Sequence, residues 1–141
     1  MIVTARSLTK YQVQIEVGQH VFIADEPLEI GDDAGPDPYS LLLSSLAACT
    51  IITVQMYARR KGWPLEDVQL RMSIQKVHAE HCKDCESEPG AKVDVIDHQI
   101  SFGGNLSPDQ IERLGEIADK CPIHRTLTSE TVIRTEVEQP G

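Results

Sequence analysis

The four cysteines of this chain fall into two pairs of different character. Cys49 lies inside an apolar run, whereas Cys121 opens the segment Cys-Pro-Ile-His-Arg much later in the chain. Cys82 and Cys85 form a Cys-x-x-Cys motif in a polar stretch. A thiol in apolar surroundings and a distant thiol beside a basic cluster are typical of a redox pair that the fold brings together. The chain is therefore a candidate thiol peroxidase.

Cys49 also admits a purely structural interpretation. The residues before it include the small side chains of Ser44, Ser45, Ala47 and Ala48, so another element could pack closely against it. Free cysteine is among the most buried residue types. Apolar burial raises the pKa of a thiol and makes it inert unless a cation or a helix end offsets the effect. Composition alone favours a core cysteine, and a reactive thiol requires such a cation.

Two arrangements are open for Cys121. His124 and Arg125 follow it within one helical turn. If Pro122 is the first residue of a short new helix, Cys121 is its N-cap, a position that stabilises a thiolate. If Cys121 instead ends the preceding helix, the helix dipole works against the thiolate. The sequence leaves both arrangements open.

Three interpretations are open for the Cys-x-x-Cys motif. With His78 and His81, Cys82 and Cys85 offer two thiolates and two imidazoles, which are ligand types of zinc. Structural zinc sites usually draw their second ligand pair from a distant segment, however, so these four residues are weak metal candidates. A redox dithiol is the second interpretation, although no thioredoxin-like βαβ pattern surrounds the motif. An exposed loop without chemistry is the third.

Composition limits the classes of function. The length of 141 residues predicts a single domain over residues 1–141. The net charge of −9, from 22 acidic and 13 basic residues, argues against binding to nucleic acid or to an anionic membrane. The N-terminal residues show no signal-peptide pattern, which predicts a cytoplasmic protein whose thiols stay reduced. Neither a glycine-rich phosphate loop nor a Ser-His-Asp order is present.

Alternating polarity predicts strands in three parts of the chain. The expected strands are two or three within residues 1–24, one each at 68–77 and 93–102, and a closing strand at 131–137. Loops are expected at residues 25–37, which are rich in proline, glycine and acidic side chains, and at 78–90.

Two helices are predicted between these strands. Asp37 and Pro38 suit the N-cap and first position of a long helix that Gly62 ends. Because this helix is apolar nearly all round, we expect it to be buried and central rather than to span a membrane. A capping box at residues 107–110 begins the second helix. Its expected core stripe is Ile111, Leu114, Ala118 and Cys121. The order of the elements predicts an α+β fold with antiparallel sheet.

Two segments of the chain resemble the OsmC/Ohr family of hydroperoxide reductases. The first runs from Gly35-Pro-Asp-Pro-Tyr to Cys49-Thr and on through Met56-Tyr-Ala-Arg-Arg-Lys-Gly-Trp-Pro. The second, Cys121-Pro-Ile-His-Arg-Thr-Leu, is similar to the family's second cysteine motif. The order of strands and helices also matches, so the resemblance covers nearly the whole chain. It is closest to the OsmC-like branch that has Asp25-Glu-Pro before the long helix and a Cys-x-x-Cys in the central loop.

The resemblance implies a fold and a reaction. It implies an intertwined homodimer, with antiparallel sheets wrapped around two long central helices and active sites at the subunit interface. Cys49 would attack an organic hydroperoxide and become a sulfenic acid, which Cys121 would resolve to a disulfide. A dithiol reductant, often lipoyl-type in relatives, would then restore both thiols. No metal or organic cofactor is implied.

The chain departs from the family pattern around the reactive thiol. Where the well-studied peroxidases carry a glutamate, this chain has Tyr39, and no arginine of its N-terminal strands sits in a matching motif. Cys49 then needs another cation, for which Arg125 and Arg59 are the candidates. We assign catalytic roles to Cys49, Cys121 and Arg125, and binding roles to Tyr39, Arg59 and His124.

An alternative function follows from the same departure. The chain would form a dimer of the same fold without peroxidase activity, binding a small hydrophobic or thiol ligand at the subunit interface. Tyr39 in place of the glutamate favours this alternative.

Overall fold

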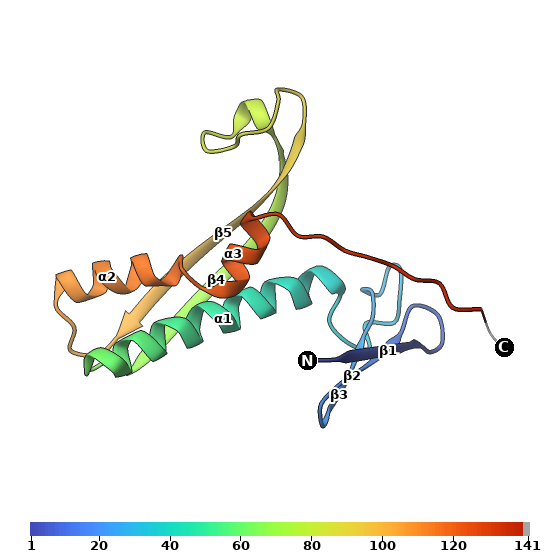
Figure 1. The fold of residues 1–141 in the computed structure, drawn as a ribbon, viewed down its shortest axis with the longest axis horizontal. Coiled ribbons are helices and arrows are strands. Elements are labelled where there is room, and N and C mark those ends of the chain that lie inside the picture. Colours follow the sequence, from blue (N-terminus) through green and yellow to red (C-terminus); the bar gives the residue numbers. More distant parts are fainter. Residues whose placement is uncertain (140–141) are drawn as a thin grey trace. The chain divides into compact units, whose positions relative to one another are not determined.

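The computed structural model describes residues 1–139 of the chain. The described residues form five strands, three α-helices and one short 3₁₀ helix (Figure 1). They divide into two compact units, one from Met1 to Ser45 and the other from Leu46 onward. The prediction of a single domain stays a prediction.

The first unit contains a three-stranded antiparallel sheet. Its strands are β1 (Val3–Ser7), β2 (Val13–Val17) and β3 (His20–Ala24), in the spatial order β1-β2-β3. A tight turn joins β2 to β3, and Gly18 adopts a φ of 57° there, a left-handed conformation that glycine reaches without a steric penalty. The expectation of two or three antiparallel strands within residues 1–24 is confirmed.

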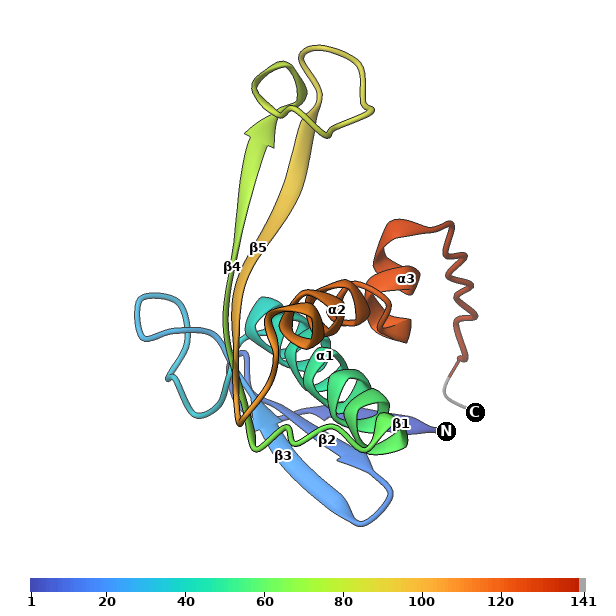
Figure 2. The same ribbon diagram turned by 90° about the vertical axis from the view of Figure 1, so that its left-hand side faces the viewer.

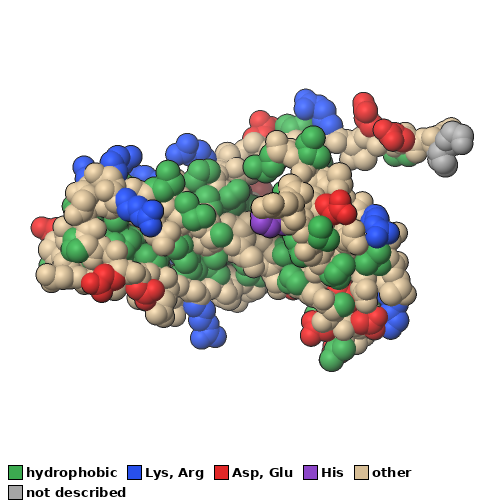
Figure 3. Space-filling model, turned by 90° about the horizontal axis from the view of Figure 1, so that it is seen from below, with side chains coloured by type: hydrophobic (Ala, Val, Ile, Leu, Met, Phe, Trp, Pro, Cys, Tyr) green, Lys and Arg blue, Asp and Glu red, His purple; other side chains and the backbone are tan. Residues whose placement is uncertain are grey.

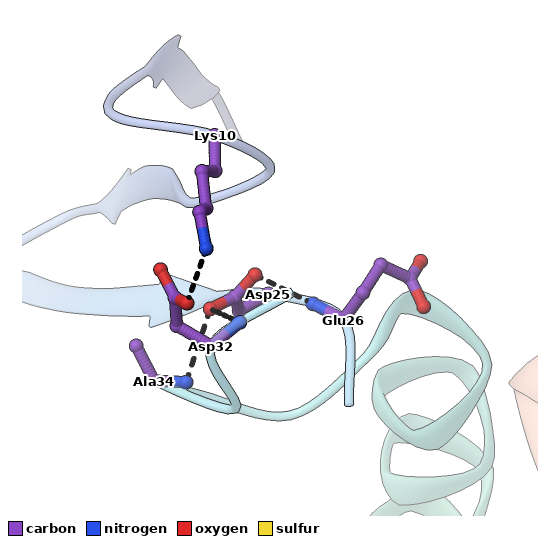
Figure 4. A network of polar contacts seen from close by, with 5 residues as sticks. All are labelled: Lys10, Asp25, Glu26, Asp32 and Ala34. Atoms are coloured by element: carbon purple, nitrogen blue, oxygen red, sulfur yellow. Dashed lines mark hydrogen bonds and ion pairs between the residues drawn. The ribbon is translucent and has the colours of Figure 1, made fainter. Parts of the chain in front are cut away.

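A buried carboxylate organises the loop that follows β3 (Figure 4). Asp25 is only 2% exposed, and its carboxylate accepts hydrogen bonds from the backbone N–H groups of Glu26 at 2.7 Å, Ala34 at 3.1 Å and Asp32 at 3.2 Å. Lys10 pairs with the Asp32 side chain at 2.9 Å. Burial by itself raises the pKa of the Asp25 carboxyl, but the three donors and the nearby Lys10 outweigh it and hold the pKa below its usual range.

Helix α1 (Pro38–Lys61) begins and ends as the sequence predicts. The Asp37 carboxylate accepts a hydrogen bond from the Ser40 hydroxyl, and this bond is the main reason that the pKa of Asp37 is lowered. At the other end Gly62 has a φ of 69° and donates to the Arg59 carbonyl at 3.1 Å. The Trp63 N–H donates to the Ala58 carbonyl at 2.9 Å, which completes a Schellman motif.

The burial of α1 differs from the expectation. Only the stripe Leu46, Thr50, Val54 and Ala58 is buried, whereas Ile52 is 54% and Met56 is 67% exposed. Burial all round was therefore the wrong expectation for a single chain, because one chain covers only one side of the helix. With a mean hydropathy of 1.7, α1 is long and apolar enough to cross a membrane, although core helices of soluble proteins also meet this criterion.

The second unit is built on a long antiparallel hairpin (Figures 1 and 2). Strand β4 (Asp67–His78) pairs with β5 (Lys92–Gly103) along their whole length, in a register that runs from Asp67 opposite Gly103 to His78 opposite Lys92. The short helix η1 (Ala79–His81) opens the loop between them. Both strands and the loop lie where the sequence predicts them.

Two helices follow the hairpin and complete the core. Helix α2 (Pro108–Ala118) begins at the predicted capping box of Ser107 and Gln110, and α3 (Pro122–Thr128) follows after a short turn. The core of the unit consists of Val54 and Ala58 from α1 and Leu114, Ile117 and Ala118 from α2. Of the expected stripe, Leu114, Ala118 and Cys121 are buried, but Ile111 is 43% exposed. Helix α2 turns its Leu114–Ile117–Ala118 face inward, which leaves Ile111 at the margin.

The predicted closing strand at residues 131–137 is wrong for this chain. The segment carries no strand, and its apolar residues Val132 and Ile133 are 64% and 86% exposed. Alternating polarity makes a strand possible, but a strand also needs a neighbour with free backbone groups. No described strand of this chain pairs with the segment.

We expect Asp25→Asn to destabilise the protein at about pH 7 and to remove part of its acid sensitivity. Because the carboxyl pKa is lower in the folded state, its contribution is present above the unfolded pKa of about 3.9 and is lost as pH falls through the folded value. Urea unfolding followed by circular dichroism at about pH 7 and about pH 3 measures both effects. Exposed Glu29→Gln is the control. Equal urea midpoints for the Asp25 variant and the parent at the higher pH would contradict this role.

Candidate functional site

Cys121 is the N-cap of helix α3. Its side chain is completely buried, and its sulfur accepts a hydrogen bond from the backbone N–H of His124 at 3.2 Å. Pro122 occupies the first helical position, so the Cys-Pro pair begins a helix instead of ending one. This resolves the two arrangements that the sequence left open.

Thr50, a residue of helix α1, connects that helix to the Cys121 cap of α3. Its hydroxyl oxygen lies 3.7 Å from the Cys121 sulfur and 2.8 Å from the Leu46 carbonyl oxygen. A hydroxyl has one proton, which the shorter distance assigns mainly to the Leu46 carbonyl, so the contact with the Cys121 sulfur is the weaker of the two.

The contact with Thr50 places Cys121 beside the segment of α1 that carries Cys49. Cys49 precedes Thr50 in the helix, so its side chain points about 100° away around the helix axis. The Cys49 thiol is partly exposed, and both cysteines are free. Within residues 1–139 the Cys49 thiol has neither a hydrogen-bond partner nor a cation paired with it.

The basic residues of the second cysteine motif lie around the cap. His124 reaches Cys121 through its backbone N–H, not through its imidazole. The backbone N–H of Arg125 donates to the Cys121 carbonyl at 3.1 Å, which holds the residue in the first turn of α3. The Arg125 side chain is exposed and forms no ion pair with any described residue. Arg125 is therefore a cation within one turn of the Cys121 cap that is free to turn toward an adjacent thiol.

Arg59 and Tyr39 lie at opposite ends of helix α1. Arg59 is exposed near the end of α1, roughly 15 Å along the helix axis from Cys49 at the usual helical rise. It lines a small hollow of about 110 Å³ together with Gln55 and Trp63. Tyr39 lies in the first turn of α1, in the first unit, and its side chain is 55% exposed. Within one chain, Arg59 is a more remote candidate than Arg125.

The second cysteine pair lies in the loop between β4 and β5. Cys82 and Cys85 form a disulfide with Cα atoms 5.4 Å apart. The loop projects from the end of the hairpin, away from helices α1, α2 and α3 (Figures 1 and 2). The weak metal candidates His78, His81, Cys82 and Cys85 are therefore together in one place, separate from Cys49 and Cys121.

Sequence reasoning missed Thr50 as a site residue. It is the one polar member of the buried stripe Leu46, Thr50, Val54 and Ala58, and it directly follows a candidate reactive cysteine. Polar side chains are rarely buried without a partner, so this spacing indicates that Thr50 faces another polar group. Which group it faces depends on the packing of α3.

Comparisons with known proteins agree on the fold. A family model described as OsmC-like protein matches residues 31–136. No match is found among the curated proteins. An OsmC like protein from Mycoplasma pneumoniae superposes with a TM-score of 0.64 at 22% identity, over 89% of this chain and 85% of that chain. Organic hydroperoxide resistance proteins from Legionella pneumophila (OsmC) and Bacillus subtilis (OhrB) give TM-scores of 0.63 and 0.62 at 19% and 18% identity. They cover 90% of this chain, and 88% and 89% of their own chains respectively.

These likenesses confirm the predicted fold. The chain has the α+β architecture of OsmC-like proteins, with antiparallel sheets and three helices. Because their identities to this chain are below 25%, the solved structures are evidence for the fold alone.

We expect Cys121→Ala to lower the free energy of unfolding by about 1 kcal/mol, because the N-cap acceptor of α3 is lost. Cys121→Ser should stay within about 0.5 kcal/mol of the parent, because a serine hydroxyl is also a good N-cap and can still meet Thr50. Urea unfolding of both variants measures the difference. Equal stability of the two variants would show that the cap contributes little.

Proposed function

Because the chain belongs to the OsmC-like family, we propose that it reduces organic hydroperoxides with Cys49 and Cys121. One observation carries the proposal: the Cys121 sulfur is held by the His124 N–H and by the hydroxyl of Thr50, the residue next to Cys49. A buried sulfur that two hydrogen bonds hold in place, next to the chain segment of a second free thiol, suits a resolving cysteine.

The reaction has three steps in this proposal. The Cys49 thiolate attacks the O–O bond and takes up one oxygen as a sulfenic acid, and the other oxygen leaves as an alcohol after protonation. The Cys121 sulfur then attacks the sulfenic sulfur, which forms a disulfide and releases water. A dithiol, lipoyl-type in our expectation, reduces the disulfide by thiol exchange and is itself oxidised to a cyclic disulfide.

Arg125 is the cation that we assign to the reacting thiol. It follows the N-cap by one turn, its side chain is exposed, and no described acidic residue pairs with it. A guanidinium within about 4–6 Å of a thiolate favours the charged form. His124 and Tyr39 keep the binding roles that the sequence assigns to them, and Arg59 would be a second cation supplied from elsewhere in the assembly.

A second copy of the chain would complete the site. The exposed side of α1 carries Ile52 and Met56, and hydrophobic side chains gather on the face drawn in Figure 3. Val132 and Ile133, in the segment that finds no strand partner in this chain, are exposed as well. Apolar surface of this kind marks protein interfaces. A cytoplasmic homodimer that buries these residues is the state in which we expect the chemistry to occur.

The alternative function keeps the dimer but not the peroxidase chemistry. The partner-free thiol of Cys49 and the exposed Tyr39 favour it, because neither supplies the charge that an activated thiolate needs. In that case the cleft between subunits would bind a small hydrophobic or thiol ligand. The two functions differ in one measurable property, which is the rate at which Cys49 is oxidised.

Cys49→Ser should abolish consumption of an organic hydroperoxide such as cumene hydroperoxide, because no nucleophilic sulfur remains at the site. Cys82→Ser/Cys85→Ser should retain most of the activity, since that pair lies in the separate loop. Peptide mass spectrometry after one equivalent of peroxide should find a Cys49–Cys121 disulfide in the parent. Reduced Cys49 after minutes of exposure would favour the alternative function.

Arg125→Gln should slow the oxidation of Cys49 about tenfold or more, because one unit of thiol pKa corresponds to 1.36 kcal/mol between the two protonation states. Stopped-flow measurement of sulfenic acid formation over a range of pH tests this, because the rate of the variant should recover at high pH. Arg134→Gln, which removes an exposed charge outside the cysteine motif, is the matched control. An unchanged pH profile would exclude Arg125 as the activating cation.

Ile52→Glu/Met56→Glu should convert the protein to a monomer, because charges on this side of α1 would be buried without partners in the dimer. Light scattering coupled to size-exclusion chromatography measures the mass. Glu112→Gln on the surface of α2 serves as the control. A parent protein that is monomeric at all concentrations would overturn the dimer proposal.

A further inference from the structure

The loop between β4 and β5 gathers metal-binding groups that the proposed peroxidase chemistry does not use. Cys82 and Cys85 are partly exposed, and the Asp84 carboxylate oxygen lies 3.3 Å from the Cys82 sulfur. One donor atom from each of these three residues lies within 4.8 Å of the other two. The cysteines are separated by two residues, the usual spacing of a thiolate pair that binds one zinc ion.

Two imidazoles precede this cluster in the chain. His78 ends β4 and His81 ends the short helix η1, and their ring centroids are 6.2 Å apart. Glu80 lies between them in the chain and accepts the Gly90 N–H at 2.7 Å, which ties the two sides of the loop together.

The charges around the two sulfurs favour a metal site over a redox dithiol. Redox-active cysteines occupy electropositive surroundings, which stabilise the attacking thiolate. This loop has Glu80, Asp84, Glu86 and Glu88 against a single Lys83. Such surroundings disfavour a free thiolate but attract a divalent cation, whose own charge then deprotonates the thiols.

We propose that the reduced loop is a zinc site and that the Cys82–Cys85 disulfide is its metal-free state. The ligands are the Cys82 and Cys85 thiolates, an imidazole from the His78–His81 turn and the Asp84 carboxylate. The two states exclude each other, because sulfurs that share a bond have no thiolate charge for the ion. The loop thus binds zinc when its two cysteines are reduced and releases the ion when they form the disulfide.

The oxidising step balances with a hydroperoxide as the two-electron oxidant. The zinc-bound thiolates of Cys82 and Cys85, one hydroperoxide molecule and two protons give the disulfide, one alcohol, one water and a released Zn²⁺ ion. The sulfurs are oxidised and the peroxide oxygens are reduced. A dithiol reverses the change by exchange and restores the ligands. Metal binding by the reduced loop does not depend on Cys49 or Cys121, so this proposal and the peroxidase proposal fail independently.

The first test is metal binding by the full chain, reduced with a phosphine and then titrated with Zn²⁺ against a chromogenic chelator. The parent should bind one zinc ion per chain, and Co²⁺ in its place should give the thiolate-to-metal absorption of a tetrahedral site. Cys82→Ser/Cys85→Ser should weaken Zn²⁺ binding by more than about 100-fold. This is the largest loss of affinity that is usual when only the residues supporting the ligands are changed. Cys49→Ser/Cys121→Ser, which removes the same number of thiols, should bind as the parent does.

The second test separates the histidines and the redox step. His78→Gln/His81→Gln should weaken Zn²⁺ binding at least about tenfold, whereas His20→Gln in β3 should not change it. Addition of a hydroperoxide to the zinc-loaded Cys49→Ser/Cys121→Ser protein should release one ion for each Cys82–Cys85 disulfide formed. Equal zinc binding by the parent and by the Cys82/Cys85 variant would overturn the proposal. The proposal would also be overturned if the reduced parent binds no zinc and only re-forms the Cys82–Cys85 disulfide.

Discussion

The second unit depends on the stripe of α1 in which every fourth residue is buried. Val54 and Ala58 form the core with α2, and one turn earlier Thr50 meets Cys121 at the start of α3. The same helix face therefore holds the fold together and positions the candidate resolving thiol. A change that rotates or shifts α1 would disturb both at once, because the α1–α2 packing and the Thr50–Cys121 contact share one rigid element. Helix packing of this kind transmits small displacements along the helix.

The small core also explains why so much apolar surface stays exposed. One chain covers a single stripe of α1 and leaves Ile52 and Met56 open to solvent. The residues after α3 add Val132 and Ile133, which are exposed in a segment that pairs with no strand among residues 1–139. Both features have the same physical cause, namely apolar side chains that find no partner among the described residues of one copy. The homodimer that we propose would supply that partner to the helix and to the segment after α3.

The two cysteine pairs occupy opposite electrostatic environments. Cys121 sits at a helix N-terminus, where its sulfur accepts the backbone N–H of His124, and Arg125 follows it within one turn. Cys82 and Cys85 sit among carboxylates at the end of a hairpin, where only an external cation would stabilise their thiolates. These different surroundings are the reason that we propose peroxide reduction for one pair and metal binding for the other. The surroundings of each sulfur, and not the presence of a thiol, decide which chemistry is available.

The sequence by itself determined most of the local structure. The capping residues Asp37 and Ser107 and the alternation within residues 68–77 and 93–102 mark helix starts and strands, because these preferences act over a few neighbouring residues. Tertiary structure alone decided the rest. Whether Cys121 ends one helix or begins the next depends on where its sulfur finds a donor, and the role of Thr50 depends on α3 packing against it. Such long-range contacts follow from the assembled fold, since no local pattern of residues encodes which distant group a buried side chain will meet.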